Sequence, residues 1–373
     1  MTRHLPAEIG APLADVDTPA LLLDLDAFER NLRHLSARAA TLGVRLRPHA
    51  KTHKSPVIAL KQIALGAIGV CCQKVSEAEA LVEGGVRNVL VSNEVVGRKK
   101  LGRLAVLARD ANIGVCVDAP EHIDALSSAA QNYGVTLDVL VEIDVGAGRC
   151  GVQPGDAALA LAQLVSRAKG LRFRGLQAYH GSAQHLRGFE ERRLAIKGAV
   201  DKVQLTRQLL ERHDLVCEEI GGGGTGTYAF EGSSGVYTDL QAGSYIFMDA
   251  DYAKNLADDG KPVREFEHSL FVYATVMSTA VRERAVLDAG LKAVSVDSGM
   301  PRLAGRDDAE YFGASDEHGK LKVTSGNRSL TIGDKVKLIP GHCDPTVNLY
   351  DWYVGYRGER VEAIWPIARG PGA

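Results

Sequence analysis

The stretch from Leu137 to Ala168 reads LDVLVEIDVGAGRCGVQPGDAALALAQLVSRA and contains one complete unit of the fold. It opens with an apolar run, continues through a glycine-rich turn and closes with apolar residues that recur at helical spacing. A short apolar run that leads into an amphipathic helix is typical of a strand in a parallel sheet covered by helices. The stretch therefore predicts one βα unit.

The same pattern recurs on both sides of this stretch, from about residue 44 to residue 247. The apolar runs give eight strand candidates: Val44–Pro48, Ala67–Cys72, Asn88–Ser92, Ile113–Val117, Leu137–Asp144, Phe173–Tyr179, Val216–Ile220 and Leu240–Phe247. The helix-like segments between them include Lys74–Glu83, Arg98–Arg109, Ala157–Ala168 and Arg192–Arg212. Eight βα units in roughly 200 to 250 residues indicate a TIM (β/α)8 barrel rather than an open Rossmann sheet.

Beyond about residue 255 the pattern changes, because apolar and polar residues alternate between turn residues with little helical period. This region predicts a smaller, C-terminal all-β domain. The predicted fold class is therefore α/β, with a barrel at residues 24–253 and a β domain at residues 254–373. Residues 1–23 could join the β domain, and the segment Thr18–Arg38 could belong to either body.

The composition is that of an ordinary globular protein, with 45% hydrophobic and 24% charged residues among 373. The 44 basic and 46 acidic side chains nearly balance, which argues against nucleic acid or an anionic membrane as a partner. We find no signal-peptide core and no apolar run of about 20 residues, so we expect a cytoplasmic protein. The six cysteines lack CxxC spacing, which predicts reduced thiols.

Polar and glycine-rich residues follow the predicted strands, at the barrel rim that carries the chemistry in this fold. The segments are RPHAKTHK (47–54), QK (73–74), GAGRCG (146–151), HGSAQH (180–185), GGGGTG (221–226) and QAGSY (241–245). Solubility alone does not explain why such residues collect at one rim.

Two of these segments suggest pyridoxal 5'-phosphate. The run Gly221–Gly224 with Thr225 exposes backbone N–H groups that can cradle a phosphate, although a flexible loop has the same composition. Lys51 stands beside His49, His53 and Lys54, and desolvation among cations lowers the pKa of a lysine towards that of a nucleophilic amine. The alternative is a solvated basic turn. Together, an amine and a phosphate cradle suit the aldehyde and the phosphate of this cofactor.

The segment GHCDPTVNLYD places His342 and Asp344 two residues apart in the predicted β domain. On an extended chain these side chains project on the same side, with Cys343 on the other. Nitrogen and oxygen ligands suit Mn²⁺, Mg²⁺ or Zn²⁺, with Mn²⁺ ranked first. A lone HxD pair is more often a hydrogen-bonded turn than a metal site.

Taken together, these segments resemble the D-threonine aldolase family, including the 3-hydroxy-D-aspartate aldolases, within the alanine racemase-like fold-type III enzymes. The resemblance spans almost the whole chain. It rests on DTPALLLDLD, RPHAKTHKSP, GVCCQKVSEAEA, VSNEVVG, VEIDVGAGRCGV, GLQAYHGSAQH, GGGTG, SGVYTDLQAGSY, FMDADY, DAGLK, DEHG and GHCDPTVNLYDW.

This resemblance implies roles for individual residues. Lys51 would be the Schiff-base lysine, and His342 and Asp344 the ligands of a divalent metal. Gln241 would meet the pyridine nitrogen, where the racemases carry an arginine, so that this contact would be neutral. The implied cofactor-binding residues are Lys51, Gln73, Arg149, Tyr179, Gly223, Gly224, Thr225, Gln241, Gly243, Ser244 and Tyr245.

The resemblance leaves the substrate open. Asp344 argues against a D-serine dehydratase, because the dehydratases have cysteine at that position. The pair Tyr179 and His180 resembles the threonine-type enzymes, whereas DSGMP and DWYVG look closer to the hydroxyaspartate type.

The implied activity is cleavage of a D-β-hydroxy-α-amino acid, such as D-threonine, D-allo-threonine or D-phenylserine, to glycine and an aldehyde. His185, or a hydroxide on the metal, would remove the hydroxyl proton. The alternatives are a 3-hydroxy-D-aspartate aldolase, a D-serine dehydratase or racemase of the same fold, and a non-catalytic carrier of pyridoxal phosphate. The basic rim would also allow a homodimer.

Overall fold

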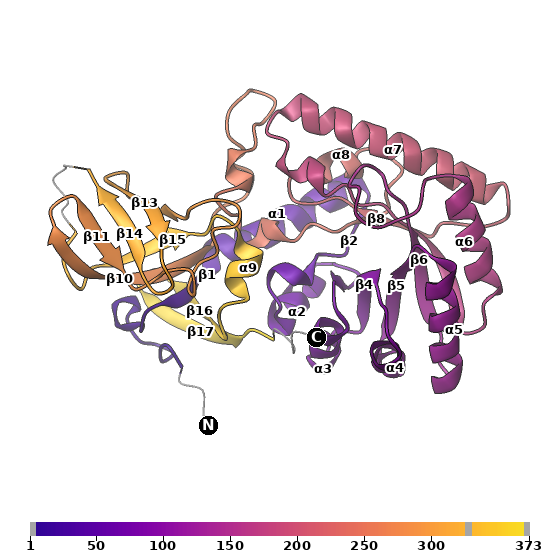
Figure 1. Cartoon of the computed structure of the whole chain (residues 1–373), viewed down its shortest axis with the longest axis horizontal. Coiled ribbons are helices and arrows are strands. Elements are labelled where there is room, and N and C mark those ends of the chain that lie inside the picture. The colour runs from indigo at the N-terminus through magenta and orange to yellow at the C-terminus, as the bar shows by residue number, and fades with distance from the viewer. Residues whose placement is uncertain (1–4, 325–329, 369–373) are drawn as a thin grey trace. The chain divides into compact units, whose positions relative to one another are not determined.

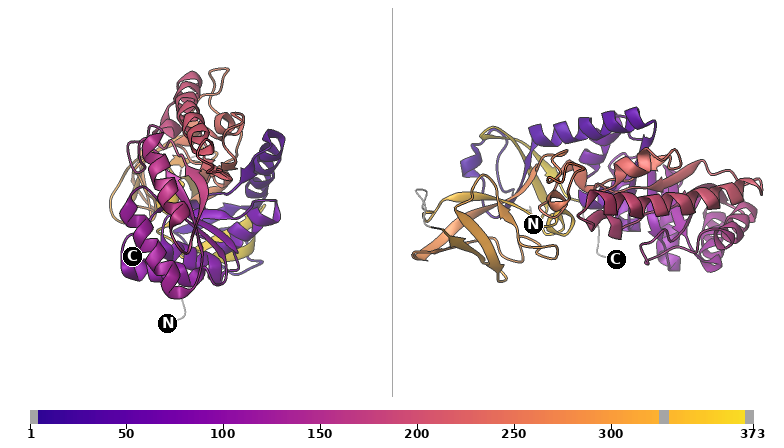
Figure 2. Two further views of the ribbon diagram at one scale, coloured as in Figure 1. Left: turned by 90° about the vertical axis from the view of Figure 1, so that its right-hand side faces the viewer. Right: turned by 90° about the horizontal axis from the view of Figure 1, so that it is seen from above.

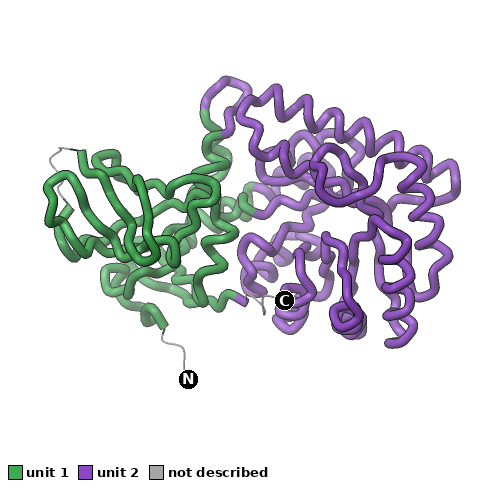
Figure 3. The backbone as a smooth tube through the Cα atoms, viewed as in Figure 1, with its two compact units in different colours: residues 1–34, 244–254, 262–367 green, residues 35–243, 255–261, 368–373 purple. Residues whose placement is uncertain are grey.

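The computed structural model describes residues 5–324 and 330–368 of the chain. The chain forms two compact units, which Figure 3 distinguishes by colour. Unit 1 comprises residues 1–34, 244–254 and 262–367, and unit 2 comprises residues 35–243, 255–261 and 368–373. Within the described ranges, no helix combines the length and the apolarity needed to cross a bilayer.

Unit 2 is built on a parallel sheet of eight strands that nearly closes into a barrel (Figure 1). In chain order the strands are β2 (Arg45–Leu46), β3 (Val70–Cys72), β4 (Asn88–Glu94), β5 (Asn112–Val117), β6 (Leu137–Glu142), β7 (Leu171–Gln177), β8 (Glu219–Gly222) and β9 (Asp239–Leu240). The sheet runs in the order β2-β9-β8-β7-β6-β5-β4-β3. Its two edges meet where the N–H of Ile68 donates to the carbonyl of Leu46 at 2.9 Å and where His49 bridges to Cys71.

Helices surround these strands, as the left view of Figure 2 shows. They are α2 (Pro56–Ala64), α3 (Val75–Glu83), α4 (Arg98–Leu107), α5 (Pro120–Tyr133), α6 (Asp156–Arg167), α7 (Phe189–Glu211) and α8 (Tyr228–Gly232), with 3-10 turns η2 (Ala50–Thr52) and η3 (Ser182–His185). Local sequence sets their ends. In α5, Pro120 occupies the first turn, where no N–H is needed, and Gly134 ends the helix in the left-handed conformation at a φ of 66°.

The barrel has apolar packing on both sides of its strands. The main core fills the space between strands and helices and includes the fully buried residues Val89, Val115, Val139 and Ile220. A smaller cluster joins Cys71, Leu90, Cys116 and Leu140. All six cysteines are free thiols, as predicted, and only Cys150 among them is not buried.

The predicted TIM-type barrel is confirmed, and its strands differ from prediction chiefly near the end. The strand expected at Val216–Ile220 begins only at Glu219, because Val216 is 65% exposed, and it continues into the glycine run as far as Gly222. The strand expected at Leu240–Phe247 covers only Asp239–Leu240. The apolar residues beyond it are buried without pairing in the sheet, and Ser244–Ile246 form a 3-10 turn.

Unit 1 is built on a mostly antiparallel sheet, so the predicted β-rich body is confirmed. Its strands are β1 (Ala20–Asp24), β10 (Leu270–Val281), β11 (Arg284–Leu287), β12 (Arg302–Leu303), β13 (Ala309–Ala314), β14 (Gly319–Val323), β15 (Lys335–Ile339), β16 (Trp352–Arg357) and β17 (Arg360–Pro366). The helical segments are η1 (Leu13–Asp15), η4 (Ser244–Ile246), η5 (Tyr252–Lys254) and α9 (Cys343–Val347), and helix α1 (Leu25–Leu42) begins in unit 1 and ends in unit 2. Strand β1 lies between β10 and β16, so the N-terminal segment belongs to this sheet.

Candidate active site

Lys51 lies on the short turn η2, directly after the first barrel strand. His49 precedes the turn in an extended conformation, and its Nδ1 accepts a hydrogen bond from the backbone N–H of Lys51 at 3.3 Å. The lysine is half-buried. The chain therefore carries Lys51 at the carboxyl end of β2, where the chemistry of a barrel of this kind is carried.

His49 ties this turn to the neighbouring strands. Its imidazole is buried, and burial lowers its pKa well below the usual value, with the positive charges of Lys51, His53 and Arg149 acting in the same direction. The amide nitrogen of Gln73 lies 2.9 Å from Nε2 of His49. The neutral imidazole of His49 therefore contacts both the backbone of Lys51 and the side chain of Gln73, which follows β3.

Arg149 lies in the loop after β6 and contacts two residues. Its guanidinium carbon is 5.8 Å from the centroid of the Tyr179 ring, within range of a cation–π interaction. Its Nη2 is 3.5 Å from Oε1 of Glu142, whose side chain is only 5% exposed. The charges of both Lys51 and Arg149 lower the pKa of His49, so the predicted residues that follow β2 and β6 are close enough to interact electrostatically.

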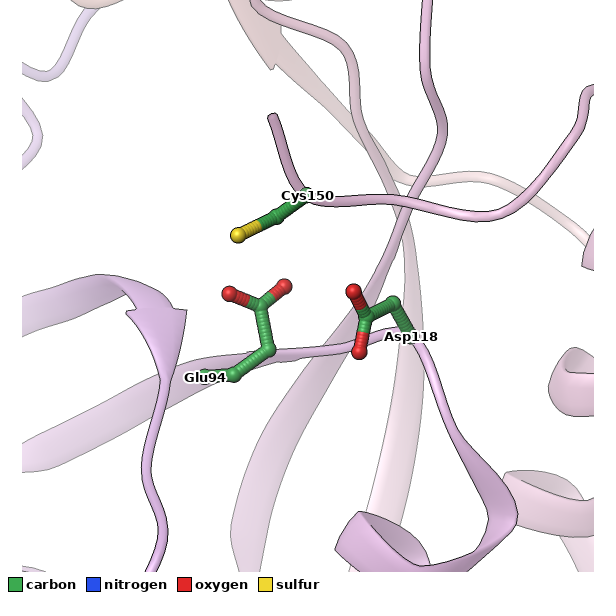
Figure 4. A group of neighbouring side chains, drawn as sticks. All are labelled: Glu94, Asp118 and Cys150. Carbon is green, nitrogen blue, oxygen red and sulfur yellow. The ribbon is translucent and has the colours of Figure 1, made fainter. Parts of the chain in front are cut away.

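A second group of polar side chains, which the sequence analysis did not single out, lies at the end of β4 and in the loops after β5 and β6 (Figure 4). Potential ligand atoms of Glu94, Asp118 and Cys150 all lie within 4.8 Å of one another. Asp118 also accepts a hydrogen bond from the N–H of Gly151 at 3.0 Å, so one of its oxygens helps to close the loop. Burial, followed by the charge of Glu94, raises the pKa of Glu142 to about 8.

The glycine loop after β8 presents donors without acceptors. Within the described parts of the chain, the backbone N–H groups of Gly223, Gly224 and Thr225 make no hydrogen bond, and the buried hydroxyl of Thr225 has no partner. Gly223 has a φ of 76°, which favours glycine, and a Cβ on Gly224 would lie 2.4 Å from Oε1 of Gln184. Clustered, unpaired amides of this kind can bind an anion.

Gln241, after β9, is buried and engaged with a second glutamine. Its Nε2 donates to Oε1 of Gln177 at 2.8 Å, and Nε2 of Gln177 donates back to its Oε1 at the same distance. Gly221 allows the close approach, since a Cβ there would lie 2.5 Å from Nε2 of Gln241. This reciprocal pair fixes the amide orientation of Gln241, and no motif in the sequence pointed to Gln177.

The chain after Gln241 returns to the turn that carries Lys51. A Cβ on Gly243 would lie 2.5 Å from Oγ1 of Thr52, so glycine is needed for this approach. The next two predicted residues belong to unit 1. There Ser244 begins η4, and Tyr245 is buried with its ring edge against Phe266, at a centroid separation of 5.7 Å.

The predicted proton acceptor His185 is the last residue of the turn η3 and is exposed. The residue before it, Gln184, is buried and binds the glycine loop, because its Oε1 accepts a hydrogen bond from the N–H of Gly226 at 2.9 Å. The segment that carries His185 is therefore anchored to the candidate anion site.

In unit 1, His342 and Asp344 flank Cys343 at the start of helix α9. His342 is extended, but the helix begins at Cys343, so the prediction that the whole HxD segment is extended is wrong. The carboxylate of Asp297 lies 2.8 Å from Nδ1 of His342. A carboxylate at Nδ1 fixes the imidazole so that Nε2 can serve as a metal ligand.

Asp249 adds a third carboxylate to this part of unit 1. Its oxygens accept hydrogen bonds from the backbone N–H groups of Tyr252 at 2.9 Å and Cys343 at 3.4 Å. Burial raises its pKa to about 6, and the charge of Asp344 acts in the same direction while His342 opposes it. An imidazole and several carboxyl groups in one place form a donor set that suits a hard or borderline divalent cation.

Comparison with known proteins agrees with both units. The family described as "Alanine racemase, N-terminal domain" matches residues 23–251, and the "Putative serine dehydratase domain" matches residues 269–356. The D-threonine aldolase of Arthrobacter sp is 50% identical, over 98% of this chain and 96% of that protein. The 3-hydroxy-D-aspartate aldolase of Paracoccus denitrificans (strain Pd 1222) is 48% identical, over 99% and 96%.

The chain belongs to the D-threonine aldolase and 3-hydroxy-D-aspartate aldolase family. The crystal structure of D-threonine aldolase from Filomicrobium marinum superposes with a TM-score of 0.95 at 52% identity, covering 98% of this chain and 99% of that one. D-threo-3-hydroxyaspartate dehydratase from Delftia sp. HT23 superposes with a TM-score of 0.84 at 25% identity, covering 95% and 98%. The predicted family, fold and enzyme class are thus confirmed.

Proposed function

We propose that this chain is an aldolase that uses pyridoxal 5'-phosphate and a divalent cation to cleave D-threonine and related D-β-hydroxy-α-amino acids to glycine and an aldehyde. The observation that carries this proposal is the set of unpaired loop amides at Gly223, Gly224 and Thr225, in a barrel whose first strand is followed by the turn that carries Lys51. Family membership supports both the aldolase chemistry and the pyridoxal cofactor.

The residues of unit 2 fit this cofactor. The loop amides and the Thr225 hydroxyl are donors that a phosphate would satisfy. Lys51 supplies the amine that binds the aldehyde, and Arg149 and Tyr179 border the ring. The amide of Gln241, oriented by Gln177, offers the ring nitrogen an uncharged contact. The cofactor, when bound, supplies an electron sink for the pair of electrons left on Cα.

The residues of unit 1 fit a divalent cation. His342 and Asp344 are assigned as ligands, and Asp297 holds the imidazole through Nδ1. Mn²⁺ is the preferred ion, with Mg²⁺ and Zn²⁺ as alternatives, because the donors are nitrogen and oxygen. A divalent cation lowers the pKa of a hydroxyl group that it binds, which is the chemistry that the β-hydroxyl needs.

One proton, that of the substrate β-hydroxyl group, must be accepted by a residue of the chain. His185 is assigned as the base that accepts the hydroxyl proton as the Cα–Cβ bond breaks. Its exposure allows exchange with water, and the anchoring of Gln184 fixes the turn that carries it. Ser244 and Tyr245 complete the proposed cofactor-binding set, together with Gln73 and Gly243. A homodimer remains part of the proposal for the assembled enzyme.

A substrate panel tests the activity. The protein is incubated with Mn²⁺ and, in turn, D-threonine, D-phenylserine, D-3-hydroxyaspartate, D-serine and D-alanine, with a chelator in parallel. Glycine with acetaldehyde or benzaldehyde supports the proposal. Pyruvate and ammonia would indicate a dehydratase, L-alanine a racemase, and no turnover a carrier. Absence of glycine from the reactions with D-threonine, D-phenylserine and D-3-hydroxyaspartate alike would reject the aldolase.

A second candidate substrate is 3-hydroxy-D-aspartate. Relatives carrying the name 3-hydroxy-D-aspartate aldolase are 48% and 47% identical over 99% of this chain, close to the 50% of the D-threonine aldolase. The same panel separates the two, because this substrate gives glyoxylate whereas D-threonine gives acetaldehyde. The ratio of the two kcat/KM values decides which substrate the site prefers.

A further inference from the structure

Glu231 is a buried carboxyl group beneath the glycine loop of unit 2. It lies in the short helix α8, and the residue is 1% exposed. Its Oε1 accepts a hydrogen bond from Oγ1 of Thr227 at 2.8 Å, whereas its Oε2 has no partner among the residues that the structure describes. Burying an ionised carboxyl group at this depth destabilises the fold unless an interaction with its surroundings compensates for the lost hydration.

A short chain of hydrogen bonds connects Glu231 to the loop. Thr227, which donates to Glu231, accepts from Nε2 of Gln184 at 2.7 Å. Gln184 in turn accepts through Oε1 from the backbone N–H of Gly226 at 2.9 Å. The loop also packs on these groups, since a Cβ on Gly223 would lie 3.5 Å from Cβ of Glu231.

We propose that Glu231 is a positioning residue for the phosphate-binding loop, holding it through Thr227 and Gln184 so that the amides of Gly223, Gly224 and Thr225 face one anion. The network engages the amide of Gly226 and leaves the three preceding amides without an acceptor among the described residues. This inference rests on the proposed function, because the anion is taken to be the phosphate of the cofactor.

The charge of Glu231 has a consequence for binding. Burial raises its pKa to about 7, and the hydrogen bond from Thr227 only partly opposes this. A phosphate dianion in the loop favours the neutral acid further. The protein without cofactor therefore takes up a proton on binding at pH values above about 7, and affinity for the cofactor falls as the pH rises through this range.

Three other titratable groups, on α7, on β9 and just before β9, make hydrogen bonds to residues other than Glu231. On α7, the guanidinium of Arg192 donates to the backbone carbonyls of Leu186 at 2.9 Å and Arg187 at 2.8 Å. On β9, Asp239 accepts from Arg45 at 2.5 Å. The phenol of Tyr237 donates to the carbonyl of Ala178 at 2.9 Å, and the charge of Glu231 is one cause of its raised pKa.

The test is a spectroscopic titration of pyridoxal phosphate into the cofactor-free full-length protein at about pH 6 and about pH 8.5. Glu231→Gln keeps the shape and the acceptor for Thr227 but cannot ionise. We expect the wild-type affinity to fall about tenfold more over this range than that of the variant, as one unit of pKa shift implies. Titration of the phosphate itself is common to both proteins and cancels. The control Glu211→Gln, exposed on α7, should retain the wild-type pH dependence.

Equal pH dependence in the wild type and Glu231→Gln would overturn the role of the Glu231 charge. Thr227→Val provides a second test, because it cuts the network while leaving Glu231 in place. We expect cofactor binding to be about tenfold weaker at both pH values. The variant loses the hydrogen bonds that Thr227 makes, and the loss of a buried hydrogen bond is of the size that changes an affinity about tenfold. Unchanged affinity would overturn the network. A wild-type protein that gives no cofactor spectrum would instead reject the proposed function itself.

Discussion

Nδ1 of His342 and a carboxylate oxygen of Asp297 lie 2.8 Å apart in unit 1. The contact selects the tautomer with the proton on Nδ1 and leaves Nε2 as the lone-pair donor. We expect Asp297→Ala to weaken Mn²⁺ binding by about 10- to 100-fold, the usual effect of removing such a partner. Isothermal titration with Mn²⁺ measures this. Asp201→Ala, a change at an exposed ion pair on α7, should leave the affinity unchanged.

Replacing Asp344 should distinguish the role of the cation from that of the cofactor. Asp344→Ala takes away a proposed ligand in unit 1 without altering the barrel, so the visible absorbance of bound pyridoxal phosphate should persist. Turnover of D-threonine should fall by at least about 100-fold, because each carboxylate ligand contributes strongly to the binding of a divalent ion. Undiminished turnover of the variant in the presence of a chelator would refute the assignment.

Lys51→Ala should abolish the visible absorbance that marks attachment of the cofactor to the protein. The reason is that the amine at the end of β2 is the proposed site of attachment. Absorbance spectra after dialysis against excess cofactor measure the effect. Lys99→Ala, an exposed lysine on α4, serves as the matched control and should keep the wild-type spectrum. A variant at residue 51 with an unchanged spectrum would exclude that lysine.

Gly224→Ala should weaken binding of pyridoxal phosphate by at least about tenfold. The added methyl group would lie 2.4 Å from Oε1 of Gln184, which is already held by Gly226, so the loop must shift. Fluorescence or absorbance titration gives the affinity. Gly198→Ala on α7 is the control, since no atom lies within 4 Å of its added Cβ. Equal affinities for the two variants would contradict the assigned cradle.

The pH dependence of stability should report on Glu142. Burial and the charge of Glu94 raise its pKa to about 8, against the opposing charge of Arg149. The folded protein therefore holds a proton that the unfolded chain releases above about pH 4.3, and the free energy of unfolding falls as the pH rises from there towards 8.

Glu142→Gln removes this titration. Between about pH 5 and pH 8 we expect the free energy of unfolding to fall by roughly 3 to 4 kcal/mol more in the wild type than in the variant. Urea unfolding curves at each pH provide the values. Parallel pH profiles for the two proteins would show that Glu142 does not carry the proton.

Much of the fold was predictable because local patterns determine it. Short apolar runs such as Asn88–Ser92 and Ile113–Val117 correspond closely to β4 and β5, since strands buried on both faces need apolar residues throughout. The apolar pattern failed to predict strands where glycines form part of a strand or where buried apolar residues lie outside one. Gly221 and Gly222 belong to β8 although glycine favours loops, and the apolar residues Tyr245, Ile246 and Phe247 are buried without forming a strand.

The site was predictable only as far as motifs and family resemblance reached. Lys51, Gln241 and His342 stand in recognisable segments, whereas their partners do not. Asp297 is 45 residues from His342 in the chain, and Gln177 is 64 residues from Gln241. Such pairs arise from tertiary packing, which no local spacing encodes. Glu231 lies in the short helix α8, which the sequence pattern did not predict, and the residue stands out only because its carboxyl group is buried in the folded protein.

The position of β1 governs how the chain can be assembled during synthesis. This strand precedes the barrel strands in the chain, yet its neighbours β10 and β16 are made only after the barrel strands. Until then Leu21, Leu22 and Leu23 stay without the sheet that buries them. The sheet of unit 1 can therefore close only late in synthesis, and the apolar side chains of β1 stay exposed up to that point.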